Sequence, residues 1–261
     1  MLKISRQAMY QYARRQHETL VDERHIIRQV RLLRHRMPRI GTRKLHERLH
    51  PLLRELGIGR DQLFDILGRH RMLIRPRKRF VTTTNSRHTL PVYPNLLART
   101  KPERPRQILV ADQTYLRLEH GFCYLSLVTD LYSRKILGVD VSATLEATGP
   151  LRAVAMALAQ IPDPCHLTHH SDRGVQYCSS DYTALLTAHG VTISMSAPAC
   201  PYDNAVAERL NGILKSEFYL DRTFASIHQA RQAVLEAITI YNSERPHLSL
   251  SMMTPEIRHA A

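Results

Sequence analysis

The first 70 residues of the chain place apolar side chains at the three- and four-residue intervals of amphipathic helices. Two such groups are Ile26, Ile27, Val30 and Leu33, and, after Gly41, Leu45, Leu49, Leu52 and Leu53. A third short helix is predicted for about 61–70, after a glycine turn at 57–59. Helix, glycine turn and helix form the helix-turn-helix pattern, whose second helix enters the DNA major groove. The same pattern occurs in small helical domains that never touch DNA.

From residue 107 onward the pattern changes to runs of β-branched and apolar residues. Three successive strands are predicted at 108–116, 124–129 and 135–141, and they favour an antiparallel meander. Helices at about 146–160, 180–189 and 203–218 then alternate with strands at 165–168 and 191–194. This order predicts an α/β fold, a ribonuclease-H-like mixed sheet flanked by helices, preceded by a small all-α helix-turn-helix domain.

The net charge of +14 is unevenly distributed along the chain. Residues 1–80 carry 21 basic and 7 acidic side chains, whereas residues 81–261 carry 16 of each. Such a concentration favours binding to nucleic acid over a merely solvated surface, because each neutralised phosphate releases counterions. We therefore predict a basic helix-turn-helix DNA-binding region at 1–80, a linker at 81–103 and a ribonuclease-H-like domain at 104–261.

The remaining composition argues against several other classes of protein. The four cysteines contain no C-x-x-C pair, so neither a zinc site nor a disulfide framework is predicted. No apolar run approaches the roughly 18 residues that a membrane helix needs, and the amino terminus lacks an apolar signal-peptide region. We expect a cytoplasmic protein without membrane contact.

Two aspartates stand at positions that suggest chemistry. Asp112 interrupts an apolar strand, where an unpaired carboxylate is costly to bury. Asp172 follows a predicted strand, where a loop can project a side chain from the sheet edge, although an Asp at such a turn is often only a cap. The neighbouring His170 is expected to orient Asp172 or to close the strand rather than to bind zinc.

Glu208 is the third candidate, on the helix predicted at 203–218. Asn204, Asn211 and Lys215 fall in the same narrow stripe of that helix, and its opposite face is apolar. Taken alone, the stripe is equally compatible with the solvated side of a surface helix. The spacing of the acids adds the missing information, because 59 residues separate Asp112 from Asp172 and 35 separate Asp172 from Glu208.

This spacing, with Lys215 seven places after the Glu, resembles the Asp, Asp, thirty-five, Glu signature of retroviral integrases and related transposases. The words around the acids resemble one family closely, the second-reading-frame transposases of the insertion-sequence-three family. These words are 111–115, 170–177 and 203–208, with further matches at 93–97, 129–136, 241–247 and 254–255 and a looser one at 41–45. The chain departs from the family where a Trp and a Thr commonly precede the first Asp, since it has Leu109 and Ala111 there.

The resemblance implies a DNA transposase that cleaves and joins strands at the ends of an insertion sequence. Asp112, Asp172 and Glu208 would be both the catalytic residues and the metal ligands, with Asp112 bridging two ions. Carboxylate oxygens suit Mg²⁺ or Mn²⁺, and two ions about 4 Å apart can neutralise the charge that develops on a reacting phosphate. Expected DNA contacts are Lys215, Asn211, Asn204 and Arg173, and, in the basic region, Arg60, Arg69, Arg71, Arg75, Arg77, Lys78 and Arg79.

The resemblance also implies partners. The protein would act on the terminal inverted repeats of its element and on target DNA, join the two ends into a circle, and assemble at least as a homodimer when it pairs them. The upstream-frame product is a further expected partner, and the bacterial nucleoid the expected location. Two alternatives stay open: a ribonuclease-H-like nuclease without strand transfer, and a catalytically inactive DNA-binding regulator.

Overall fold

The computed structural model describes residues 6–74, 90–97, 100–197 and 205–261, and the chain divides into two compact units, Met1–Pro76 and Arg77–Ala261. Among the described helices, none is both long enough and apolar enough to cross a membrane. The sequence pattern changes from helical to strand-like spacing between the two units.

The described part of the first unit contains four helices: α1 (Arg6–Arg36), α2 (Thr42–Arg48), α3 (His50–Glu55) and α4 (Arg60–Arg69). Each contributes fully buried side chains to a shared apolar core, among them Ile26 of α1, Leu45 of α2, Leu53 of α3 and Leu63 of α4. Glu23 of α1 forms an ion pair with Arg69, the last residue of α4, and its other carboxylate oxygen lies 3.4 Å from His70 Nε2, so polar contacts connect α4 to α1.

The helix predicted through Leu45–Leu53 is in fact two helices. It is interrupted at Leu49, which caps α2 and precedes α3, and Pro51 occupies the first turn of α3. Proline has no N–H to donate to the preceding turn, so a continuous helix would lose a hydrogen bond there. The glycine turn after α3 is present as predicted, and the φ of +64° at Gly57 is a left-handed conformation that favours glycine.

The second unit is built on a mixed sheet of six strands, in the order β3-β2-β1-β4-β5 with β6 also pairing with β1. The strands are β1 (Ile108–Leu118), β2 (Phe122–Asp130), β3 (Ile136–Ser142), β4 (Thr168–Ser171), β5 (Thr192–Met195) and β6 (Thr223–Phe224). β1, β2 and β3 form the predicted antiparallel meander, whereas β4, β5 and β6 join in parallel.

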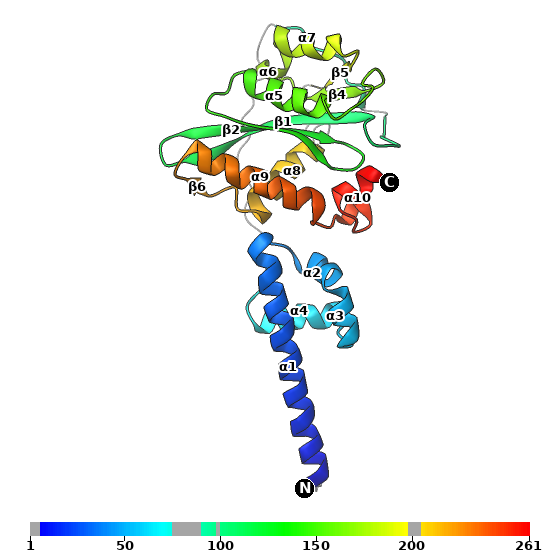
Figure 1. Cartoon of the computed structure of the whole chain (residues 1–261), viewed down its shortest axis with the longest axis vertical. Helices are drawn as coiled ribbons and strands as arrows, with labels where there is room; N and C mark the ends of the chain where they lie inside the picture. The colour runs from blue at the N-terminus through cyan, green and yellow to red at the C-terminus, as the bar shows by residue number, and fades with distance from the viewer. Residues whose placement is uncertain (1–5, 75–89, 98–99, 198–204) are drawn as a thin grey trace. The chain divides into compact units, whose positions relative to one another are not determined.

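Helices cover both faces of this sheet (Figure 1). One layer holds α5 (Thr148–Leu158), α6 (Val175–Cys178) and α7 (Ser180–Ala188), and the other holds α8 (Ala205–Glu217) and α9 (Ile227–Ser243). Alternate side chains of β1 pack against the two helical layers. Leu109 and Ala111 belong to the core under α5 and α7, and Ile108 and Val110 belong to the core with α8. The α/β fold of mixed sheet and flanking helices is as predicted.

Two elements differ from the sequence pattern. β4 begins at Thr168, three residues later than predicted, because its position is set by pairing with β1, where Thr168 N donates to Gln107 O at 3.0 Å. The pattern also did not reveal the segment after α8, which forms β6, α9, a short 3-10 helix (Leu248–Leu250) and α10 (Pro255–Ala260).

The contact between β3 and α5 predicts a site of high sensitivity to volume. A Cβ added at Gly138 would lie 1.9 Å from Ala153 O, whereas one added at Gly212 on α8 would meet nothing within 4 Å. Gly138→Ala should therefore lower the free energy of unfolding by about 1–3 kcal/mol or more, because α5 must move away from the sheet.

Urea denaturation followed by circular dichroism measures this effect. Gly212→Ala is the matched control and should be neutral or stabilising by up to about 1 kcal/mol, since alanine favours a helix. Equal midpoints for Gly138→Ala and the wild type would contradict the packing described.

Candidate active site

The sheet register brings Asp112 and Asp172 together. Val110 of β1 lies opposite His170 of β4 in a parallel ladder, and each aspartate follows two residues later. Parallel neighbours keep their alignment as they leave the ladder, so the two carboxylates lie at the same edge of the sheet. Their charges are close enough to interact, because Asp172 raises the pKa of Asp112.

Asp112 has two hydrogen-bond donors and an incompletely compensated charge. Its Oδ2 accepts from Asn211 Nδ2 at 2.7 Å and its Oδ1 from Gln113 N at 2.9 Å. Burial raises the pKa of Asp112 to about 7, with a further increase from the charge of Asp172 and a smaller one from Glu208, against the two hydrogen bonds that lower it. Near neutral pH, protonation of Asp112 or binding of a cation would compensate its unfavourable negative charge.

Asp172 is held by the turn that follows β4. Its Oδ1 accepts from Gly174 N at 2.9 Å, and a Cβ at Gly174 would come within 3.0 Å of that oxygen. Glycine thus permits the close approach of backbone and carboxylate. The side chain between them, Arg173, donates from Nε to Ser196 O at 2.8 Å and so links this turn to the end of β5.

Helix α8 runs along β1 and makes polar contacts with it at two levels. Asn211 is buried and reaches Asp112, and Lys215 Nζ donates to Thr114 Oγ1 at 2.7 Å. Four residues of helix rise about 6 Å and two residues of strand about 6.6 Å, so the helix and the strand stay in step. The interpretation of this stripe as a solvated helix face is therefore wrong for Asn211 and Lys215.

Glu208 lies one turn earlier on α8 and is exposed. Among the described residues, no group of three or more His, Cys, Asp or Glu side chains lies close enough together to hold a metal ion. The structure thus brings the two aspartates together and places Glu208 in the first turn of α8, where its charge acts on Asp112. The available donors are all carboxylate oxygens, the type that Mg²⁺ and Mn²⁺ prefer.

Tyr177 is a neighbour of the aspartates that the sequence analysis did not single out. It is buried in α6, and its hydroxyl has no hydrogen-bond partner among the described residues. Burial raises the pKa of Tyr177 well above 10, and the charge of Asp112 raises it further. Tyr177 belongs to the sequence motif 170–177, but only the packing of α6 brings it near Asp112.

The two histidines before Asp172 have structural partners. His170 Nδ1 lies 2.8 Å from Ser194 Oγ and its Nε2 lies 3.3 Å from Ser196 Oγ, so it joins β4 to β5 as a closing residue. His169 Nε2 lies 2.9 Å from Tyr182 OH, and burial lowers the pKa of His169 to about 3. Both side chains sit in the sheet, away from solvent.

The candidate DNA contacts of the basic region are described only in part. Arg60 pairs with Asp61 at 2.9 Å, Arg69 pairs with Glu23, and Arg71 is exposed at a left-handed φ of +54°. The remaining predicted contacts lie outside the described residues: Arg75, Arg77, Lys78 and Arg79, and, before α8, Asn204.

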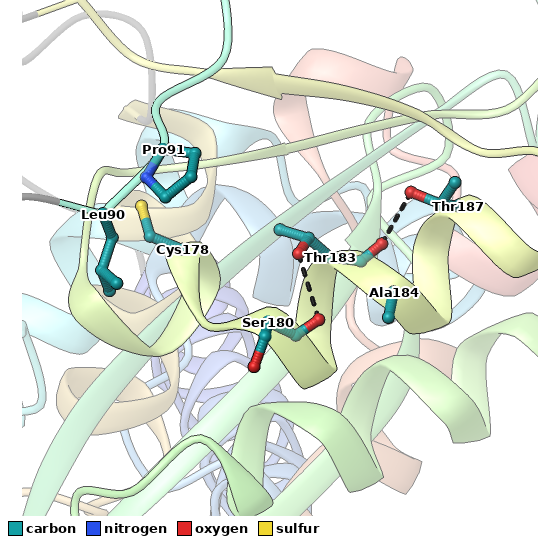
Figure 2. Close-up of a pocket in the computed structure, with 7 residues that line it drawn as sticks. All are labelled: Leu90, Pro91, Cys178, Ser180, Thr183, Ala184 and Thr187. Carbon is teal, nitrogen blue, oxygen red and sulfur yellow. Dashed lines mark hydrogen bonds between the residues drawn. The ribbon is translucent and has the colours of Figure 1, made fainter.

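A separate hollow of about 440 Å³ lies beside α7 (Figure 2). Its lining comes from α6 and α7 and from Leu90 and Pro91, and it contains none of the three acids. Thr183 and Thr187 each donate their hydroxyl to a backbone carbonyl one turn earlier, so these polar groups are satisfied within the helix. This hollow has no group suited to phosphate chemistry.

The fold and the acids define a class of protein that the comparisons identify. Two family models described as integrase core domain match residues 102–201 and 189–255. A solved structure, the intasome of simian T-cell lymphotropic virus in complex with PP2A regulatory subunit B56 gamma, aligns with a TM-score of 0.54 at 18% identity. That alignment covers 85% of this chain and 75% of the viral one. The second unit has the ribonuclease-H-like fold of an integrase core.

The sequence relatives narrow this class. An insertion element IS600 31 kDa protein from Shigella sonnei is 39% identical over 221 residues, covering 82% of this chain and 79% of the relative. The transposase InsF for insertion sequence IS3A from Escherichia coli K12 is 36% identical over 192 residues, covering 73% and 67%. The chain belongs to the transposase family of insertion sequence IS3.

The raised pKa of Asp112 predicts a pH-dependent stability. Because the pKa of Asp112 is about 7 in the folded protein and about 4 in an unfolded chain, stability is lost as pH rises from about 4 to 7. Asp112→Asn removes the titrating charge and keeps an oxygen that accepts from Gln113 N, while its NH₂ donates to Asn211 Oδ1 once the Asn211 amide turns over. It should stabilise the protein, and by about 2–3 kcal/mol more at pH 8 than at pH 5.

Chemical denaturation at both pH values in the presence of a chelator tests this prediction. Asp181→Asn, at an exposed position in the first turn of α7, is the control and should change stability by about 0.5 kcal/mol or less. A gain for Asp112→Asn that is the same at pH 5 and pH 8 would refute the assignment of the charge.

Proposed function

We propose that Asp112, Asp172 and Glu208 are the catalytic residues with which this transposase cleaves and joins DNA strands. The observation that carries the proposal is the pair of neighbouring aspartates at one sheet edge, of which Asp112 has a pKa of about 7. Two like charges at a partly buried position are unfavourable unless a cation joins them. A role in binding metal and phosphate accounts for their proximity.

The same three side chains would hold divalent metal, Mg²⁺ or Mn²⁺, as a pair of ions. Such ions would neutralise the charge that develops on the phosphate oxygens and would make a water nucleophilic at neutral pH. The rigid partners of the two aspartates, Asn211 and Gly174, hold their oxygens in place for this purpose. Glu208, in the exposed first turn of α8, would complete the site.

The chemistry consists of two phosphoryl transfers. In the first, water attacks a phosphodiester at the end of the element and leaves a free 3′ hydroxyl. In the second, that hydroxyl attacks another phosphodiester, which breaks one ester bond and forms another. Neither step needs a covalent bond to the protein.

The polar residues of α8 acquire different roles. Asn211 would position Asp112, since its amide is buried against that carboxylate. Lys215 lies at the opposite end of the stripe from Glu208, where its ammonium would neutralise a DNA phosphate. Arg173, one residue from Asp172, would do the same on the other side of the site.

The first unit would bind the terminal inverted repeats through its basic surface, with α3, the glycine turn and α4 as the helix-turn-helix, while 81–103 links it to the catalytic core. Target DNA would enter at the carboxylates. Pairing two ends requires two copies of the chain, so we propose a homodimer or larger assembly on DNA. The upstream-frame product is the proposed protein partner, and the bacterial nucleoid the proposed location.

Neither competing function is favoured. A nuclease without strand transfer would need only the acids, whereas the relatedness to IS3 transposases extends over 73% of the chain. An inactive DNA-binding regulator would leave the raised pKa of Asp112 and the buried amide that positions it without a purpose.

The catalytic assignment predicts a large loss of activity for Glu208→Gln. Metal-mediated stabilisation of the transition state is worth several kcal/mol, so cleavage and joining of labelled terminal-repeat DNA in Mn²⁺ should fall by about 10²-fold or more. Glu236→Gln, the same substitution on an exposed position of α9, should keep wild-type activity. The assay is run with and without the upstream-frame product, and equal activity of Glu208→Gln and wild type would exclude the assignment.

The DNA-binding role of the first unit predicts a change in salt dependence. Replacing Arg60, Arg69 and Arg71 together by Gln should weaken binding to duplex DNA and reduce the slope of log affinity against log salt by up to about 0.9 for each lost phosphate contact. Fluorescence anisotropy over a range of salt concentrations measures the slope. An unchanged slope in a variant with wild-type thermal stability would disprove these contacts.

A further inference from the structure

The far end of β1 and the start of β2 carry two aromatic rings. Tyr115 and Phe122 contact each other edge to face, with ring centroids 5.2 Å apart and an interplanar angle of 83°. Phe122 begins β2 and is 51% exposed, so one of its surfaces faces solvent. Tyr115 follows Asp112 by three residues on β1, about 10 Å along the strand, and this odd separation places the two side chains on opposite faces of the sheet. Lys215 contacts both Thr114 and the Tyr115 ring, and so connects the two faces.

Cations surround this aromatic pair. Lys215 Nζ lies 4.4 Å from the centroid of the Tyr115 ring while it donates to Thr114 Oγ1. Arg117 is the direct cross-strand neighbour of Phe122, and it is near enough to Lys215 to lower that residue's pKa, an effect smaller than that of burial. Asp221 is the carboxylate that acts on Lys215 at this end. Arg222, packed over Phe224 at 4.8 Å, adds a third cation beside the end of β1.

The edge of β1 is open at this point. On the side away from β2, β4 pairs with residues 108–110 and β6 with residues 117–118, and the described strands leave 111–116 between them without a ladder. The open stretch contains Asp112, Thr114 and Tyr115. A DNA strand with its reacting phosphate at Asp112 can therefore pass over this open edge beside Lys215 to reach the rings on the other face.

We propose that Tyr115 and Phe122, flanked by Lys215 and Arg117, form a stacking site for an unpaired DNA base next to the reacting phosphate. This inference rests on the proposed function, because it places the base relative to the proposed catalytic acids. Aromatic rings bind bases of any sequence through their faces, and neighbouring cations bind the phosphates between them. The site would hold a terminal base pair open and so admit the strand end to the carboxylates.

The exposed position of Phe122 allows a test that does not disturb the fold. The probe is a duplex with a three-nucleotide single-stranded 3′ end that carries 2-aminopurine, compared with a blunt duplex of the same sequence. Wild type should bind the frayed duplex more tightly and quench the 2-aminopurine fluorescence. Phe122→Leu keeps an apolar side chain but no ring, and should lose the quenching and about 10-fold in affinity for the frayed duplex.

Two further variants serve as controls. Phe122→Trp restores an aromatic face and should restore the quenching, and Met156→Ala, at an exposed position of α5, should behave as wild type. Thermal unfolding confirms that each variant is folded. Quenching by Phe122→Leu equal to that of wild type would overturn the stacking site and limit Phe122 to packing on Tyr115.

A cleavage assay on the frayed duplex in Mn²⁺ separates this proposal from the proposed function. Loss of cleavage in Glu208→Gln with normal quenching supports both proposals, because stacking then precedes chemistry. Cleavage unaffected by Glu208→Gln would overturn the catalytic assignment, while the quenching data would still decide the stacking site.

Discussion

The carboxylate of Asp112 sits in the strand that pairs with three others, and the cost of its charge governs its surroundings. Two hydrogen bonds, from Asn211 and from the backbone of Gln113, stabilise the ionised form. Burial and the neighbouring Asp172 oppose it more strongly, so the pKa of Asp112 stays near neutral. The ionised carboxylate of Asp112 is therefore only incompletely stabilised by its hydrogen-bond donors.

Helix α8 matters to the site through its alignment with β1. A helix advances about 1.5 Å per residue and a strand about 3.3 Å, so contacts at i and i+4 on α8 meet alternate residues of β1. Asn211 meets Asp112 and Lys215 meets Thr114 in this way, and Ala207 packs with Ile108 and Val110. One register thus places a positioning amide, a cation and the first turn that carries Glu208 along the same strand.

Residues at the end of α9 and just after it attach that segment to α8 and to β3. Arg245 is buried and forms a bidentate pair with Glu217, the last residue of α8, at 2.8 and 2.9 Å. Asn242 of α9 both accepts from Ile136 N and donates to Ile136 O, which attaches α9 to the start of β3. Removing one partner of such a buried pair leaves an uncompensated charge, so the word 241–247 serves the fold rather than the chemistry.

The sequence by itself determined the class of fold, the order of the main strands and the positions of the acids, because alternating and helical periodicities are local and the spacing of the acids is read directly. It could not determine that β4 starts at Thr168 or that Asn211 faces Asp112 instead of solvent. Only the tertiary structure decided these points, since register between β1 and β4 and between β1 and α8 depends on contacts between residues 60 to 100 positions apart. The contacts among Tyr115, Phe122 and Lys215 were likewise not predictable from the sequence, because a polar stripe on a helix does not reveal which strand the helix packs against.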